Sequence, residues 1–341
     1  MRISTPRWWY IRDARARLPV RLLLGPLSLA WAAATARRIA RGHPVDPGVP
    51  VVCVGNLTMG GSGKTPVARE IARHLREAGQ EVHFLARGHG GRLAGPVLVD
   101  PGLHSASEVG DEALILAGDG PAWIARDRAA GARTAAGAGA QVIVMDDGHQ
   151  NPAVKKTLSL VVVDGETRDG EWPFGSGAIF PAGPLRESLS AGLARADAVV
   201  ILLPADLPEV DPGLRALFLG KKVLSARLRP LVSPPPSPQI GFAGIAKPWK
   251  MRRALEAAGY RLVDFTAFPD HGPVSKSDLE RLAARARKLG AGLVTSEKDW
   301  VRLPASWRPQ VTAWPVRAVF EDQQALAELL AGLIGTVKPR L

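Results

Sequence analysis

One glycine-rich segment carries the residues whose types and spacing point most directly to chemistry. It reads V-V-C-V-G-N-L-T-M-G-G-S-G-K-T over residues 51–65. An apolar strand that runs into glycines and then a helix forms a phosphate cradle, because backbone N–H groups and the helix N-terminus face the negative charge. In that arrangement Lys64 reaches the β- and γ-phosphates of ATP, and the Thr65 hydroxyl binds Mg²⁺. The predicted nucleotide site comprises Thr58, Met59, Gly60, Gly61, Ser62, Gly63, Lys64 and Thr65.

The segment departs from the P-loop pattern G-x-x-x-x-G-K-[ST] at its first position, where this chain has Thr58. Glycine adopts positive φ without strain, so we expect Gly60 and Gly61 to supply the missing backbone freedom. A glycine-rich surface loop is the alternative. The apolar strand before the loop and the G-K-T triplet weigh against that alternative.

A second element ends in two neighbouring carboxylates, Asp146 and Asp147, which follow the apolar run Q-V-I-V-M. A carboxylate at a strand end helps to hold Mg²⁺ in P-loop enzymes, whereas the alternative is a solvated turn. Because successive strand residues point to opposite faces, we expect the two aspartates to do different jobs, and which one contacts Mg²⁺ stays open. The spacing after this pair and the residues at 296–299 do not match the motifs of GTPases, so we expect ATP as the nucleotide.

Apolar runs alternate with helix-like segments from residue 50 onward. We expect strands at residues 51–54, 82–85, 142–145, 160–163, 199–203, 223–224, 240–242, 293–295 and 311–314, and helices at 68–78, 125–136, 250–258 and 277–289. This alternation predicts an α/β fold, a P-loop NTPase-type doubly wound parallel sheet with a second, smaller α/β lobe. Five prolines interrupt residues 229–238. We therefore divide the chain into an N-terminal region (1–41), a P-loop core (42–228), a Pro-rich linker (229–239) and the smaller lobe (240–341).

Positive charge and apolar residues are concentrated at the N-terminus. Residues 1–41 hold nine arginines and one acid, in a chain of net charge +12, and the arginines flank an uncharged apolar stretch at 22–36. A spanning helix needs about 20 apolar residues, so we predict an interfacial helix that docks on anionic lipid. A buried helix and a cleaved signal peptide are the alternatives. Positive charge that flanks an apolar stretch does not favour nucleic acid as a partner. The chain has one cysteine, Cys53, which excludes an internal disulfide.

Seven short motifs occur in one order along the chain. They are V-G-N-x-x-x-G-G-S-G-K-T-P (54–66), A-R-G-H-G-G (86–91), E-V-G-D-E-A (108–113), D-D-G-H-Q-N (146–151), F-P-A-G-P-L-R-E (180–187), F-P-D-H (268–271) and T-S-E-K-D (295–299). Together they resemble the tetraacyldisaccharide 4′-kinase family, the lipid A 4′-kinases of lipopolysaccharide synthesis. Several motifs in register are far more specific than a P-loop alone.

The resemblance implies transfer of the ATP γ-phosphate to the 4′-hydroxyl of a membrane-bound, acylated glucosamine disaccharide 1-phosphate. It implies a peripheral enzyme on the cytoplasmic face of the inner membrane. It also implies a catalytic pair, which falls on Asp111 and His271. A carboxylate base suits this chemistry, because the sugar hydroxyl loses its proton as the phosphoryl group arrives. The alternatives are a helix N-cap for Asp111 and a structural role for His271.

Arg186 and Glu187 follow a turn that contains two prolines. We expect Arg186 to stabilise charge on the transferring phosphate and Glu187 to assist Mg²⁺ or the acceptor site, and the alternative is a surface ion pair between them. The roles of three further basic residues stay open, namely Arg126, Arg128 and Lys298.

The chain departs from the family pattern at His149 and Asn151, which stand where the family often has Phe and His. We expect His149 to serve packing. Two rival functions are a membrane-associated P-loop ATPase switch without a small-molecule acceptor and a soluble kinase for a small metabolite. The switch does not need the catalytic pair, and the soluble kinase leaves the N-terminal helix unexplained.

Overall fold

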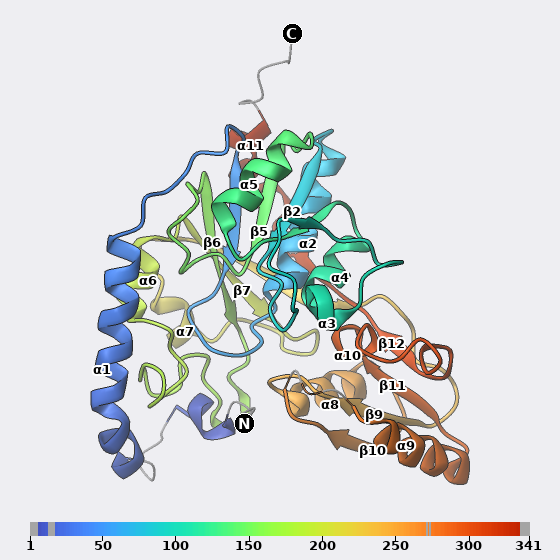
Figure 1. The fold of residues 1–341 in the computed structure, drawn as a ribbon. Helices are drawn as coiled ribbons and strands as arrows, with labels where there is room; N and C mark the ends of the chain where they lie inside the picture. Colours follow the sequence, from blue (N-terminus) through green and yellow to red (C-terminus); the bar gives the residue numbers. More distant parts are fainter. Residues whose placement is uncertain (1–5, 13–17, 271, 273, 335–341) are drawn as a thin grey trace.

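The computed structural model describes residues 6–12, 18–270, 272 and 274–334, and within them a nine-stranded sheet forms the larger of two lobes (Figure 1). Its strands are β1 (Val51–Gly55), β2 (Val82–Ala86), β3 (Val97–Leu98), β4 (Ala122–Ile124), β5 (Val142–Asp146), β6 (Leu158–Asp164), β7 (Ala198–Leu203), β8 (Lys222–Pro230) and β13 (Val316–Phe320). They lie in the order β13-β8-β7-β6-β1-β5-β2-β4-β3. Neighbours pair in parallel except at the edges, where β3 with β4 and β13 with β8 are antiparallel. The predicted doubly wound sheet is confirmed.

Helices bury both faces of this sheet, as its continuous apolar strands require. Val52 and Val54 of β1 pack into one apolar cluster, whereas Val51 and Cys53 face the other side. The first face is covered by α2 (Lys64–Glu77), α4 (Asp111–Ala117) and α11 (Gln323–Ile334), and the second by α5 (Arg128–Gly137), α6 (Leu189–Ala194) and α7 (Pro212–Ala216). A short helix, α3 (Ala106–Val109), precedes α4, and η1 (Arg7–Tyr10) and η3 (Arg168–Gly170) are single 3₁₀ turns.

The smaller lobe is built on a four-stranded parallel sheet of order β10-β9-β11-β12. Its strands are β9 (Gln239–Ala243), β10 (Leu262–Ala267), β11 (Gly292–Ser296) and β12 (Thr312–Trp314), and its helices are α8 (Pro248–Ala257), α9 (Lys276–Leu289), α10 (Glu297–Trp300) and the 3₁₀ turn η4 (Arg308–Gln310). The short helix α10 contacts α4 of the larger lobe. The two lobes therefore meet next to the predicted catalytic Asp111.

The C-terminal segment does not stay in the smaller lobe, where the sequence placed residues 240–341. Strand β13 pairs with β8 at the edge of the nine-stranded sheet. Its Phe320 and residues Leu326, Leu330 and Leu333 of α11 belong to the core cluster of the larger lobe. The amphipathic α11 buries its apolar side against α2, so residues 316–334 are part of the core.

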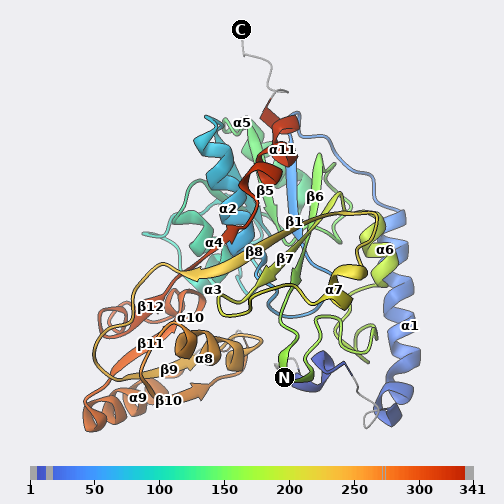
Figure 2. The same cartoon turned by 180° about the vertical axis from the view of Figure 1, so that it is seen from behind.

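Helix α1 (Leu18–Ala40) runs along the side of the core opposite the smaller lobe, next to α6 (Figures 1 and 2). Its 23 residues extend beyond the predicted apolar stretch. Within the described part of the chain it is the one helix that could cross a membrane by length and composition, and its most apolar window is only 11% buried.

The polarity of α1 is reversed relative to a helix of a water-soluble domain. Ser28 and Thr35, seven residues apart on one face, are buried against the core. Leu22, Leu23 and Leu29 face outward, with 69%, 78% and 73% of their surface exposed. Apolar residues on the outer face and small polar residues on the inner face suit a lipid environment outside the helix.

Candidate active site

The glycine-rich loop adopts the conformation that a phosphate cradle requires. Gly60 and Gly63 both have positive φ, 83° and 81°. Gly63 caps the N-terminus of α2, and a Cβ there would lie 2.1 Å from Leu202 Cδ2, so a larger residue would require Leu202 to move as well as a strained backbone. Thr58 instead lies in an extended bridge with Leu185, where a side chain is tolerated. Gly60, two residues after Thr58, therefore supplies the backbone freedom that the P-loop pattern assigns to its first glycine.

Thr65 joins the loop to the end of β5. Its hydroxyl donates a hydrogen bond to Asp146 Oδ2 at 2.7 Å. Among the described residues, Asp146 Oδ1 and Ser62 Oγ are buried without a hydrogen-bond partner. Burial, followed by the charge of Glu112, raises the pKa of Asp146 to about 7. Buried polar atoms without partners are rare, and Asp146 Oδ1 belongs to the carboxylate that accepts from Thr65, so a hydroxyl and a carboxylate, both Mg²⁺ ligands, lie together. A divalent cation fits this donor set.

Asp147 does a different job from Asp146. It has φ of 54°, which is uncommon for a residue with a side chain. Its carboxylate pairs with Arg186 Nη1 at 2.9 Å and with Lys64 Nζ at 3.6 Å. Burial would raise the pKa of Asp147, but Lys64 and Arg186 outweigh that effect and hold it well below its usual range. Asp147 is thus an anionic anchor for two basic side chains of the site.

Asp111 begins α4 at the lobe boundary and is almost fully buried. Gly110 occupies the N-cap position, so the capping alternative for Asp111 does not describe this helix. The Oδ1 atom of Asp111 accepts the backbone N–H of Glu112 at 2.8 Å, and Arg302 Nε of the smaller lobe lies 3.5 Å from Oδ2. His271 lies outside the described residues. The residue before it, Asp270, is close enough for its charge to raise the pKa of Lys298, so Asp270 lies near the lobe boundary.

Glu112 is a residue of the site to which the sequence assigned no role. Its carboxylate accepts a hydrogen bond from Lys298 Nζ at 2.9 Å. The positive charge of Lys298 lowers the pKa of Glu112. Burial opposes this shift, and the charge of Lys64 adds to it. Lys298 therefore joins the smaller lobe to α4 of the larger lobe. Glu112 belongs to the E-V-G-D-E-A motif, which marks it as a candidate site residue. Its partner Lys298 is 186 residues away, so the motif alone does not reveal the contact.

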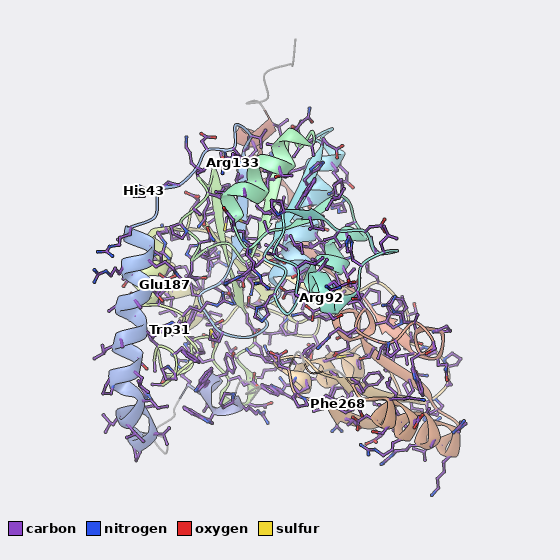
Figure 3. All side chains as sticks on the ribbon, viewed as in Figure 1. Trp31, His43, Arg92, Arg133, Glu187 and Phe268 are labelled. Carbon is purple, nitrogen blue, oxygen red and sulfur yellow. The ribbon has the colours of Figure 1, made fainter. Side chains whose placement is uncertain are left out.

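Arg186 and Glu187 form no ion pair with each other. Arg186 donates from Nε to the Thr58 carbonyl at 3.0 Å and pairs with Asp147. Glu187 is buried, and both of its oxygens accept from Arg195 at 2.6 Å, while Gln150 donates to one of them at 3.0 Å. In Figure 3 Glu187 lies on the side of the core that faces α1. Its carboxylate is directed to Arg195 and Gln150, and Arg186 points to the nucleotide loop.

Two arginines that the sequence could not rank occupy different places. Arg128 is buried, and burial lowers its pKa to about 10. The negative charges of Asp147 and Asp146 oppose this shift. Arg126 is exposed and donates to the carbonyls of Gly91 and Arg92 at 3.4 and 3.3 Å. Arg128 therefore belongs to the site, and Arg126 holds the A-R-G-H-G-G loop.

His149 is a packing residue. It is 1% exposed, and its ring nitrogens contact Ser159 Oγ at 3.1 Å and the Gly192 carbonyl at 2.9 Å. Burial lowers its pKa to about 4, so the ring is neutral near pH 7. It joins α6 to the sheet through Gly192 and Ser159.

A second contact between the lobes lies at the end of β6. Lys247 and Lys250 of the smaller lobe both donate to the Asp164 carboxylate, at 2.7 and 2.5 Å. The ring of Tyr10 lies 3.7 Å from Lys247 Nζ, and the Tyr10 hydroxyl donates to the carbonyl of Met59 in the glycine-rich loop. The N-terminal turn, the nucleotide loop and the smaller lobe thus meet at Tyr10.

Comparison with known proteins agrees with this geometry. A model of the family tetraacyldisaccharide-1-P 4′-kinase matches residues 20–335. Tetraacyldisaccharide 4′-kinase of Phenylobacterium zucineum is 63% identical over 333 residues, which are 98% of this chain and 100% of that protein. The protein of the same name from Caulobacter sp. strain K31 is 60% identical over 330 residues, 97% of this chain and 98% of the relative.

The fold also matches a solved structure. The crystal structure of LpxK from Aquifex aeolicus in complex with ATP superimposes with a TM-score of 0.71 at 25% sequence identity, covering 92% of this chain and 99% of that one. The agreement extends over both lobes and over the full length of the relatives. The chain therefore belongs to the tetraacyldisaccharide 4′-kinase family.

Proposed function

We propose that this chain transfers the γ-phosphate of ATP to the 4′-hydroxyl of a tetraacyldisaccharide 1-phosphate in lipid A biosynthesis. The relatives that cover almost the whole chain carry this activity in their name. The observation that carries the proposal is the packing of α4, which begins with Asp111, against α2, which begins with Lys64 of the nucleotide loop. The candidate base Asp111 and the phosphate-binding loop therefore belong to the same site.

ATP is held by the glycine-rich loop in this proposal. Lys64 contacts the β- and γ-phosphates, and the N–H groups at the start of α2 face them. Thr65 and Asp146 would hold Mg²⁺, which would neutralise negative charge on the phosphates. Arg186 and Arg128 add positive charge next to the same phosphates. Glu187 supports this group through Gln150, so we place it beside the acceptor site and not on the metal.

Asp111 is the proposed general base. The 4′-hydroxyl gives its proton to the carboxylate as its oxygen bonds to the γ-phosphorus, and the bond from that phosphorus to the ADP oxygen breaks. Arg302 Nε lies 3.5 Å from Asp111 Oδ2 and places a positive charge beside this carboxylate. By its family motif, His271 orients this carboxylate.

The acceptor is a lipid, and α1 places the enzyme on the surface that contains it. The outward leucines insert among acyl chains, and Arg37 and Arg38 in the last turn reach anionic headgroups. The inner face of α1 contacts the core, so the helix lies along the surface as a peripheral element. We assign it to the cytoplasmic face of the inner membrane, because ATP is supplied from that side.

The test is transfer of radiolabelled phosphate from ATP to tetraacyldisaccharide 1-phosphate in mixed micelles. The wild type should label the lipid, and Asp111→Asn should lose about two to four orders of magnitude in rate, the range of general-base catalysis, while it still binds ATP. ATP hydrolysis without labelled lipid would instead support the ATPase switch.

A further inference from the structure

An indole N–H of the membrane-docking helix is bound to the backbone of the phosphate-site arginine. Trp31 Nε1 on α1 donates to the carbonyl oxygen of Arg186 at 3.0 Å. The Trp31 ring is 40% exposed, so part of it faces outward with the leucines of α1. A tryptophan at a membrane surface usually directs its N–H to headgroups or water. In this chain the N–H is directed to the protein, at one specific peptide group.

Two further contacts on α1 hold the same loop. Ser28, one turn before Trp31, donates from Oγ to the Ile179 carbonyl at 2.9 Å and accepts the N–H of Ala182 at 3.2 Å. The ring of Phe180 lies 4.8 Å from the Trp31 ring, centroid to centroid. Polar side chains of α1 therefore fix the main chain of residues 179–186, and Figure 3 shows Trp31 on the part of α1 that faces the core.

The other side of this loop is fixed to the nucleotide site. The Arg186 N–H donates to the Leu57 carbonyl at 2.8 Å, and the Met59 N–H donates to the Pro184 carbonyl at 2.7 Å. The guanidinium of Arg186 then reaches Thr58 and Asp147. Both backbone polar groups of Arg186 are thus hydrogen-bonded. Its N–H bonds to Leu57, next to the nucleotide loop, and its carbonyl oxygen bonds to Trp31. A displacement of α1 relative to the core acts directly on the residue that carries positive charge to the phosphates.

We propose that Trp31 is a positioning residue for phosphoryl transfer, which sets Arg186 against the nucleotide loop when α1 is docked on lipid. The inference rests on the proposed function, in particular on the docking of α1 and the charge role of Arg186. Small misplacements of a catalytic group cost rate even when substrate binding is unaffected. The contact therefore makes catalysis sensitive to how the helix sits on the membrane, in addition to bringing the enzyme to its lipid.

Trp31→Phe tests this inference, because it keeps an aromatic ring against Phe180 and removes only the N–H and the second ring. At saturating lipid and ATP, kcat should fall about three- to tenfold, the equivalent of one hydrogen bond in net terms. The KM for ATP and the sedimentation with anionic vesicles should stay at wild-type values. Leu29→Ser, on the outward face of the same helix, is the matched control. It should weaken vesicle binding and raise the apparent KM for lipid while kcat is retained.

A double-mutant cycle separates positioning from a general structural effect. If Trp31 acts through Arg186, Trp31→Phe should cost little further kcat in an Arg186→Lys background. An unchanged kcat in Trp31→Phe, or a loss that saturating lipid restores, would overturn the inference and make Trp31 a lipid anchor alone. Absence of labelled lipid in the wild type would refute the proposed function instead, so the two failures are distinguishable.

Discussion

The Thr65 hydroxyl donates a hydrogen bond to Asp146 Oδ2 at 2.7 Å, across 81 residues of chain. The contact follows from the sheet, because β1 and β5 are parallel neighbours with Val54 opposite Asp146. The loop after β1 and the carboxylate at the end of β5 then emerge at the same edge, as ligand sites of open α/β sheets do.

Thr65→Ala should raise the Mg²⁺ concentration needed for half-maximal kinase activity at least about tenfold, because a proposed ligand and the partner of Asp146 are lost together. Thr65→Ser keeps the hydroxyl and serves as the control. Kinase rates measured across a Mg²⁺ titration, after the protein is stripped with chelator, give the comparison. Equal Mg²⁺ requirements in all three proteins would remove Thr65 from the metal site.

Asp147→Asn should behave differently from any change at the metal. It removes the charge that anchors Lys64 and Arg186, so kcat should fall about ten- to hundredfold, the equivalent of one charge-assisted hydrogen bond. The Mg²⁺ requirement should stay at the wild-type value. A large increase in that requirement would mean that Asp147, and not Asp146, is the carboxylate that holds Mg²⁺.

Leu23→Ser on α1 should weaken binding to anionic vesicles about ten- to hundredfold, since one leucine side chain no longer enters the acyl region. Leu103 supplies a matched control, because it is 80% exposed, against 78% for Leu23, and lies in the loop between β3 and α3. Leu103→Ser should bind vesicles like the wild type. Equal binding by Leu23→Ser and the wild type in a sedimentation assay would show that this face of α1 does not enter the membrane.

His149→Phe should reduce the sensitivity of the fold to mild acid and retain kinase activity. The unfolded chain takes up a proton on this histidine near its ordinary pKa of 6.5, whereas burial in the folded protein lowers the pKa to about 4. The unfolded state binds more protons between these values, so wild-type stability falls as the pH drops from 6.5 toward 4. Urea unfolding at several pH values should show a smaller fall for the variant. An identical fall in both proteins would mean that His149 is not the responsible group.

Much of the core could be predicted from the sequence, because its signals are local. Strands such as β1, β5 and β7 are continuous apolar runs, and the glycine-rich loop and the Asp146–Asp147 pair follow them directly. The reversed polarity of α1 was not foreseen at the level of Ser28 and Thr35, since an apolar composition does not tell which face meets the protein.

The parts that could not be predicted depend on contacts between distant segments. Strand β13 resembles any short strand of the smaller lobe, and only its antiparallel pairing with β8 assigns it to the core. The choice between Arg126 and Arg128 likewise depends on burial beside Asp146 and Asp147. The bonds from Lys298 to Glu112 and from Trp31 to Arg186 join segments whose neighbourhood no spacing in the sequence reveals.

The most direct measurement is the position of the new phosphate on the lipid product. The purified enzyme is given ATP with a labelled γ-phosphate and tetraacyldisaccharide 1-phosphate, and the product is treated with mild acid, which removes the glycosidic 1-phosphate and leaves phosphate esters intact. The label should remain on the acid-treated lipid, at the 4′-oxygen. Label released by the acid with the 1-phosphate, or found only as inorganic phosphate with no labelled lipid, would contradict a 4′-kinase.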